Sequence, residues 1–230
     1  MKNITRIVHS LNVKRKMIQT LAINIEEARV KDGMNVVERA LKRGTDIVVS
    51  LLGLIFLSPV FLYVYIKLKR QKDGPVLFRQ ERIGKGGKAF NILKFRTMRV
   101  DSESQGTPQL AKSHDNRLTP AGKFLREHHL DELPQLWNVF VGDMSFVGPR
   151  PERQYFIDKI MEENSDYELL YQIRPGITSM ATIYNGYTDT MEKMLIRLQM
   201  DLDYLNRRSL WLDCKIVMTT VKLIVNGKKF

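Results

Sequence analysis

The stretch IVVSLLGLIFLSPVFLYVYI, residues 47–66, decides the fold of this chain. It carries no charged side chain, and a helix needs about 20 apolar residues to cross the hydrocarbon core of a bilayer. The stretch begins too far into the chain for a cleaved secretory signal, and the first 30 residues contain no continuous apolar run. We therefore expect a permanent membrane segment within residues 41–70.

Ser58 and Pro59 lie inside this apolar stretch and predict a break. Proline removes a helical hydrogen bond and clashes with the preceding turn. Basic residues favour the cytoplasmic side, and here they flank both ends of the stretch. These flanking cations are Lys42, Arg43, Lys67, Lys69 and Arg70. The pattern favours a helix–break–helix that enters the membrane and returns to the same face, and a kinked transmembrane helix is the alternative.

The positive charge of the chain is concentrated next to this stretch. Residues 67–99 hold eleven Lys or Arg and two acids, a net charge of +9 out of the +12 of the whole chain. Such a patch favours polyanions, namely nucleic acid, anionic lipid or diphosphate groups. We identify no helix-turn-helix, zinc-finger or RNP-type pattern, which argues against a nucleic-acid-binding protein.

The cysteine and the histidines of the sequence argue against a disulfide and against a zinc site. Cys214 is the one cysteine, so the sequence predicts no internal disulfide, and its apolar neighbours suggest a small buried residue. The four histidines have no metal-ligand spacing, so we expect no zinc site.

The first 40 residues form an N-terminal extension. Ile4, Ile7, Val8 and Leu11 have helical spacing among basic residues, which suits an amphipathic helix at an anionic interface. A disordered basic tail suits the same pattern.

The region after the membrane segment predicts a β-hairpin and a helix. Residues 76–83 and 89–98 read as strands around the loop GKGGK, which lacks the spacing of a P-loop. Residues 101–118 are polar and predict a loop. Thr119 and Pro120 then predict the start of a helix that runs to about His128.

Two segments carry candidate chemistry. Asp131 is predicted to cap a helix that continues past Pro134 to about Gly142, with Glu132 in its first turn. A helix N-terminus stabilises a carboxylate and favours a phosphate beside it, although Asp131 as a simple cap is the alternative. Arg150 lies between two prolines on a stiff loop, where its planar guanidinium suits a phosphate or a pyrimidine edge. A surface turn is the alternative there.

Together these segments resemble the monotopic phosphoglycosyl transferases, the bacterial sugar transferase family that starts the assembly of capsule, lipopolysaccharide, exopolysaccharide and glycoprotein glycans. The resemblance spans roughly residues 40–225. The matching motifs are Lys42-Arg43 with Asp46, Ser58-Pro59, KFRTM (residues 94–98), LDELPQLWNV (130–139), GDMSFVGPRP (142–151), RPGIT (174–178) and Asp213.

The resemblance implies a reaction and a set of site residues. Asp131 would attack the sugar-proximal phosphate of a UDP-sugar, UMP would leave, and polyprenyl (undecaprenyl) phosphate would take the phosphosugar from the aspartate. Glu132 would help to hold Mg²⁺, an ion that one or two carboxylates and substrate phosphates suffice to bind. The implied substrate-binding residues are Lys94, Arg96, Arg126, Arg150 and Asp213.

The resemblance also implies a location, the cytoplasmic face of the bacterial inner membrane, and it leaves open a homodimer and the identity of the sugar. The sequence departs from the family at His128-His129, where small polar residues are more usual. It departs again at Ser179-Met180-Ala181-Thr182, where relatives often have Gly-Trp-Ala-Gln.

We therefore expect an α+β monotopic membrane protein with a re-entrant helix, interfacial amphipathic helices, a small β-hairpin and a compact cytoplasmic catalytic region. Its parts would be the extension 1–40, the membrane segment 41–70 and the catalytic domain 71–230. The apolar spacing of residues 192–228 predicts helices packed on the catalytic core. The alternative functions are a non-catalytic membrane scaffold for glycan assembly and a basic nucleic-acid-binding protein.

Overall fold

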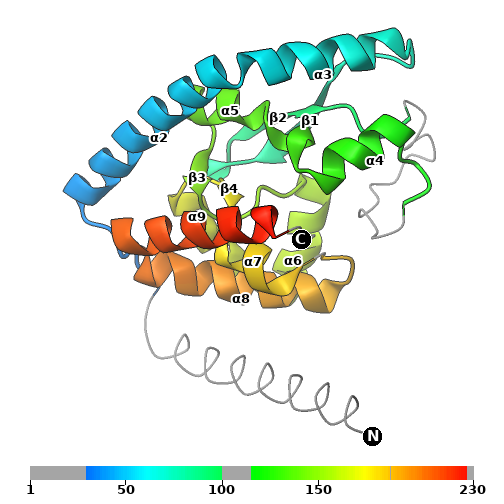
Figure 1. Ribbon diagram of the computed structural model, residues 1–230. Helices are drawn as coiled ribbons and strands as arrows, with labels where there is room; N and C mark the ends of the chain where they lie inside the picture. The colour runs from blue at the N-terminus through cyan, green and yellow to red at the C-terminus, as the bar shows by residue number, and fades with distance from the viewer. Residues whose placement is uncertain (1–29, 100–114, 187, 227–230) are drawn as a thin grey trace, which may run out of the picture.

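The computed structural model describes residues 30–99, 115–186 and 188–226, and a bent pair of helices comes first among its elements. Helix α2 (Val36–Phe56) and helix α3 (Ser58–Arg70) meet at an angle of 59°. Figure 1 shows them along one edge of the molecule, with α5 and the hairpin beneath. Among the described helices none alone has the length and apolar character of a membrane span, whereas this bent pair together does. The expected break is confirmed.

Local hydrogen bonds explain how the chain tolerates the break. Pro59 lies in the first turn of α3, where its missing N–H costs little. The Ser58 hydroxyl donates to the carbonyl of Ile55 at 2.7 Å and the N–H of Leu57 donates to Gly53, so carbonyls at the end of α2 keep partners. At its other end α2 begins with a capping box, in which Asn35 and Glu38 each accept the other's backbone N–H.

Polar contacts join α2 to α5 and to Ser145. The guanidinium of Arg43 donates to the carbonyls of Val139 and Phe140, at 2.7 and 2.8 Å, and so caps the C-terminal end of α5 (Gln135–Val141). The buried carboxylate of Asp46 accepts from Ser145 at 3.2 Å. The N-terminal half of α2 is therefore part of the folded body.

The outer face of the bent pair exposes large apolar side chains. Exposed apolar residues on α2 and α3 include Val48, Leu51, Leu52, Ile55, Phe56, Leu62 and Ile66. A contiguous apolar face of this kind marks a site of contact with another apolar phase or partner.

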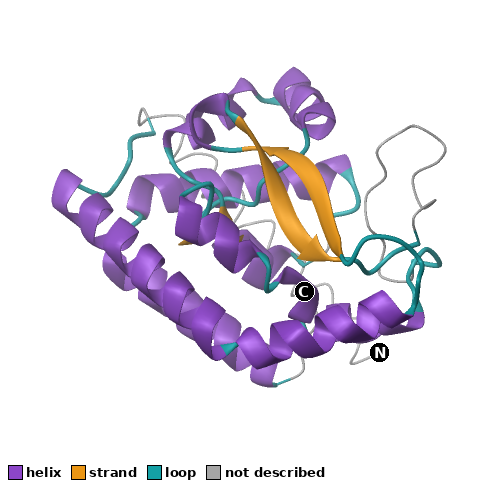
Figure 2. Ribbon diagram, turned by 90° about the horizontal axis from the view of Figure 1, so that it is seen from above, coloured by secondary structure: helices purple, strands orange, loops and turns teal. Residues whose placement is uncertain are grey.

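The expected hairpin is confirmed, with a shorter second strand. Strand β1 (Leu77–Ile83) pairs antiparallel with β2 (Ala89–Phe95), from Leu77 opposite Phe95 to Ile83 opposite Ala89. Figure 2 shows the two strands in orange. The turn, η1 (Lys85–Gly87), uses two glycines with φ of 70°, which residues with a Cβ rarely adopt. Beyond Phe95 the chain leaves β1, and Met98 forms an isolated bridge with Leu118 instead.

A second pair of strands was not expected. Strand β3 (Ser145–Val147) pairs in parallel with β4 (Gly176–Thr178). Gly148 and Gly176 allow the two backbones to approach, because a Cβ built on Gly176 would lie 2.1 Å from the nitrogen of Gly148. Strands of three residues are too short to show a period-two pattern.

Five of the remaining helical segments border the main apolar core. They are α6 (Gln154–Glu163), η3 (Ser165–Gln172), α7 (Met180–Asn185), α8 (Met191–Arg207) and α9 (Leu210–Val225). Helix α4 (Pro120–Glu127) instead packs Ala121 and Leu125 in a second cluster with Phe95 of β2. The helical tail is confirmed, with Met194, Leu198 and Leu202 buried in the core, and it is broken at Arg208. The α+β class is confirmed as well.

One expectation about the tail is wrong. Cys214 is exposed, because α9 turns Asp213 and Ile216 inward and leaves Cys214 on the outer face. The expectations for the N-terminal helix and for most of the loop at 101–118 lie outside the described residues.

Candidate active site

The two candidate carboxylates lie in a short 3-10 turn, not at a helix cap. Asp131 and Glu132 belong to η2 (Leu130–Glu132). The residue before this turn, His129, has a φ of 55°. Asp131 was expected as the N-cap of α5, and this is wrong: the cap is Pro134 and the helix begins at Gln135. The turn closes when the N–H of Leu133 donates to Leu130, ahead of a proline that has no N–H to give.

Helix α4 leads into this turn from the predicted start. The hydroxyl of Thr119 accepts from the N–H of Gly122 at 2.9 Å, which confirms it as the N-cap. Gly122 lies against β2's continuation, where a Cβ would come within 1.9 Å of the carbonyl oxygen of Thr97. This close contact fixes α4, and with it the turn that carries the two carboxylates.

Lys94 of β2 reaches the pair directly. Its ammonium lies 2.6 Å from a carboxylate oxygen of Glu132, and both side chains are partly buried. Burial alone would raise the pKa of Glu132, but the charges of Lys94, Arg150 and His129 outweigh it and lower that pKa to about 2. Glu132 is therefore ionised across the neutral range.

Asp131 has the opposite electrostatic environment. Its carboxylate is 6% exposed, and burial together with the charge of Glu132 raises its pKa, against the opposing charges of Lys94, Arg126 and His129. Adjacent carboxylates in unlike environments take different roles at one pH. Here Asp131 is the more basic of the two.

The structure brings two predicted arginines toward the pair. Arg126, in the last turn of α4, donates from Nε to the hydroxyl of Thr97 at 3.1 Å, and its charge acts on Asp131. Arg150 follows β3, and its charge acts on Glu132. Asp131, Glu132, Lys94, Arg126 and Arg150 thus form one site, built from β2, α4, η2 and the loop after β3.

Arg96 lies elsewhere. It is 5% exposed, its Nη1 lies 3.8 Å from a carboxylate oxygen of Asp73, and its Nη2 donates to the carbonyl of Leu68 at 3.4 Å. These contacts place Arg96 under the C-terminal end of α3. Within the described part of the chain, no hydrogen bond or ion pair joins Arg96 to Asp131 or Glu132.

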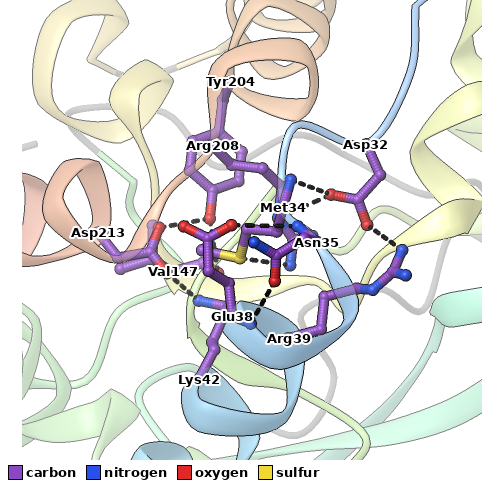
Figure 3. Close-up of polar contacts among 10 residues, drawn as sticks. All are labelled: Asp32, Met34, Asn35, Glu38, Arg39, Lys42, Val147, Tyr204, Arg208 and Asp213. Carbon is purple, nitrogen blue, oxygen red and sulfur yellow. Dashed lines mark hydrogen bonds and ion pairs between the residues drawn. The ribbon is translucent and has the colours of Figure 1, made fainter.

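Asp213 also lies in a separate cluster. Figure 3 shows Lys42 of α2 and Tyr204 of α8 pointing toward the Asp213 carboxylate from opposite sides. Lys42 forms an ion pair with it, and the hydroxyl of Tyr204 donates to it at 2.6 Å. Across residues 30–99, 115–186 and 188–226, no hydrogen bond or ion pair connects Asp213 to the Asp131–Glu132 pair. Its contacts link the first turns of α2 to α8 and α9.

Two features of the site were missed from the sequence. The charge of His129 acts to lower the pKa of both carboxylates. Its positive φ could not be predicted from the sequence. Glu152 belongs to a buried cluster of charged side chains next to Arg150. It was not predicted from the sequence, although it directly follows Pro151 of the GDMSFVGPRP motif.

The carboxylates of the site are candidate ligands for a metal ion. In the described ranges no group of three or more His, Cys, Asp or Glu side chains is placed to hold a metal by itself. Mg²⁺ is commonly held by one or two carboxylates together with substrate phosphates and water. The Asp131–Glu132 pair fits that requirement, since Glu132 is ionised and Lys94 contacts one of its two oxygens.

Comparison with known proteins places the chain among enzymes of one kind. The family model described as bacterial sugar transferase matches residues 37–227. The chain is 40% identical over 187 residues to the UDP-N-acetylgalactosamine-undecaprenyl-phosphate N-acetylgalactosaminephosphotransferase of Aeromonas hydrophila, covering 81% of this chain and 44% of the relative. It is 43% identical over 187 residues to the UDP-glucose:undecaprenyl-phosphate glucose-1-phosphate transferase of Escherichia coli, covering 80% and 40%.

A third relative differs again in its sugar. The chain is 35% identical over 228 residues to a galactosyl transferase, CpsE, of Streptococcus agalactiae, covering 89% of this chain and 49% of the relative. The chain thus spans less than half the length of these three relatives.

Proposed function

This chain belongs to the bacterial sugar transferase family, and from that membership we propose that it transfers a sugar-1-phosphate from a UDP-sugar to polyprenyl phosphate. The observation that carries the proposal is the unequal pair of carboxylates among cations. Asp131 is buried with a raised pKa, and Glu132 is held ionised beside Lys94.

Asp131 is the nucleophile in this proposal. Its carboxylate oxygen attacks the sugar-proximal phosphorus, the bond from that phosphorus to the bridging oxygen breaks, and UMP leaves with the electron pair. An oxygen of polyprenyl phosphate then attacks the same phosphorus, and the bond to Asp131 breaks. The products are UMP and a polyprenyl diphosphate sugar. Asp131 is the better nucleophile of the pair because it is the more basic.

The surrounding cations make this chemistry feasible. A carboxylate attacks an anionic diphosphate only where positive charge offsets the phosphate oxygens. Lys94, Arg126 and Arg150 supply that charge from three separate elements. Glu132 is the protein ligand we assign to Mg²⁺, which when bound would supply further positive charge to the diphosphate.

We assign α2 and α3 to a re-entrant membrane segment. Both ends of the pair pack on one folded body: Arg43 and Asp46 contact α5 and β3, and Val64 and Leu68 pack with Phe95 and Leu125. Two ends held by the same body lie on the same side of a bilayer. The stretch between Asp46 and Val64, residues 47–63, is about 26 Å even as a straight helix, which is shorter than a hydrocarbon core of about 30 Å.

This placement puts the site at the membrane surface. The basic flanks favour the cytoplasmic face for both ends of the segment. There residues 71–230 would form the catalytic domain, which meets a UDP-sugar from solution and the lipid phosphate from the bilayer.

A screen for UMP release tests the proposal. Purified protein in detergent, with Mg²⁺ and undecaprenyl phosphate, is incubated with a panel of UDP-sugars, and free UMP is measured. We expect at least one UDP-sugar to give UMP together with a labelled lipid product, and Asp131→Asn to give neither. UDP-sugars that all stay intact would favour a non-catalytic scaffold.

A further inference from the structure

A buried cluster of charged side chains lies behind the site, outside the residues assigned so far. Glu152 accepts from Arg197 of α8 at 2.7 Å and from Arg82 of β1 at 3.4 Å. All three side chains are largely buried. Asp201, one turn beyond Arg197 on α8, is 2% exposed, and its Oδ1 has no hydrogen-bond partner in the described chain.

This cluster holds the segment that carries Arg150. Arg82 donates to the carbonyl of Pro151, the residue after Arg150, at 3.1 Å. The N–H of Ile83, next to Arg82 in β1, donates to the carbonyl of Glu152 at 3.0 Å. Residues 151 and 152, directly after Arg150, are therefore held by contacts from β1 and α8.

Arg150 and the cluster also share a cavity. Arg150, Glu152, Arg197 and Asp201 line a small pocket of about 10 Å³, next to Tyr167 of η3. A space of this size admits at most a single water molecule. The Arg150 segment therefore has little room to shift against the cluster.

Burying so many charges is a weak source of stability. The cost of removing ions from water is as large as the attraction between them, so well-packed apolar residues would stabilise the fold equally well. A rigid, fully directional support has another use. It holds one backbone segment in one place. Here that segment carries Arg150, whose charge lowers the pKa of Glu132.

We propose that Glu152, clamped between Arg82 and Arg197, is a positioning residue that holds Arg150 in place for the diphosphate of the donor. The proposal rests on the proposed function, because it assigns Arg150 to the substrate. Glu152 acts through Arg150 and touches no reacting atom. An arginine that binds phosphate through a planar fork depends on orientation, and a displacement of about 1 Å can cost a hundredfold in rate.

A double-mutant cycle tests this role. Glu152→Gln keeps the size and an acceptor oxygen but loses the charge that holds both arginines. In the wild-type background we expect kcat/KM for the UDP-sugar to fall roughly tenfold to a hundredfold. In an Arg150→Ala background we expect the same substitution to cost less than about threefold, since residues that act through one another are not additive. Glu163→Gln, on the exposed end of α6, is the matched control and should change neither background.

The outcomes separate the two proposals. Losses that multiply in the double variant would make Glu152 a merely structural residue and would overturn the positioning role, with UMP release by the wild type intact. A wild type that releases no UMP would overturn the proposed function itself, and this inference with it. If Glu152→Gln does not fold, Arg197→Met replaces it, because that change removes one of the two cations and leaves Arg82 on Glu152. The same non-additivity with Arg150→Ala is then expected, and additive losses overturn the role.

Discussion

The Lys94 ammonium lies 2.6 Å from the Glu132 carboxylate, and the carboxylate of Asp131, the preceding residue, has no such ion pair among the residues that the structure describes. This contact, together with the charges of Arg150 and His129, makes the two adjacent acids unequal. Glu132 keeps its negative charge throughout the neutral range, whereas burial and the charge of Glu132 raise the pKa of Asp131. A metal ligand and a nucleophile need these two different properties.

Replacing Lys94 should change the pH dependence of activity. In Lys94→Met the burial of Glu132 is opposed only by more distant cations, so its pKa rises from about 2. A carboxylate with a higher pKa is protonated at a higher pH. We therefore expect the acidic limb of kcat/KM to move to higher pH, in addition to an overall loss of rate, with Lys88→Met on the exposed hairpin turn as control. If the acidic limb does not move, Lys94 does not set the pKa of Glu132.

Glu132→Gln should weaken the binding of Mg²⁺. An amide retains the shape of the side chain but is a poor ligand for a hard cation. We expect the Mg²⁺ concentration for half-maximal rate to rise at least about tenfold, the lower end of what even an outer-shell residue contributes. Titration of UMP release with Mg²⁺ measures this, and Glu162→Gln on α6 is the control. Wild-type rates of the variant at limiting Mg²⁺ would show that Glu132 is not a Mg²⁺ ligand.

Asp201→Asn should stabilise the protein most at high pH. Burial raises the pKa of Asp201 to about 7, above the value of about 4 expected in the unfolded chain. The folded state therefore binds the proton more tightly, and the free energy of unfolding falls as pH rises from about 4 to about 7. Asparagine does not titrate and escapes this loss.

Thermal unfolding at pH 5 and pH 8 measures the effect. We expect the Tm of Asp201→Asn to exceed that of the wild type at pH 8 by on the order of 5 °C more than it does at pH 5. Asp203→Asn, near the same end of α8 but in a surface ion pair with Arg207, is the control. The same Tm difference at both pH values would show that Asp201 is not held in a charge-disfavouring site.

Cysteine labelling tests the re-entrant segment. Lys31 and Lys69 flank the bent pair and are exposed, and single cysteines at each are introduced in a Cys214→Ser background because Cys214 is itself exposed. We expect both cysteines to be shielded from a membrane-impermeant thiol reagent in spheroplasts and both to react after lysis. Labelling at position 31 alone from outside would mean a through-span.

The sequence predicts those parts of the fold that depend on local chemistry. Proline at position 59, the glycines of the hairpin turn and the Thr119 cap each act within a few residues, and the structure confirms all three. Hydrophobic spacing likewise predicts the buried face of α8. The helix start after Asp131 was misplaced because a 3-10 turn and a capped helix place the same residues before a proline.

Contacts between distant segments could not be read from the residue order. Glu152 pairs with Arg82, 70 residues earlier, and with Arg197, 45 residues later, and no periodic pattern connects them. The parallel pairing of β3 with β4 and the contact between Lys42 and Asp213 are equally distant in the chain. For the site, the family resemblance implied Asp131, Glu132, Lys94, Arg126 and Arg150 together with Arg96 and Asp213, and only the fold separates the last two from the others.

The nucleophilic role of Asp131 is tested most directly by mass spectrometry of the intermediate. The protein is incubated with Mg²⁺ and the UDP-sugar that gives UMP, without polyprenyl phosphate, and is quenched and digested. We predict a phosphosugar adduct on the peptide that contains Asp131, lost on addition of polyprenyl phosphate and missing from Asp131→Asn, which keeps the fold because the amide is nearly isosteric. Full UMP release by Asp131→Asn, or an adduct on another residue, would contradict the proposed reaction.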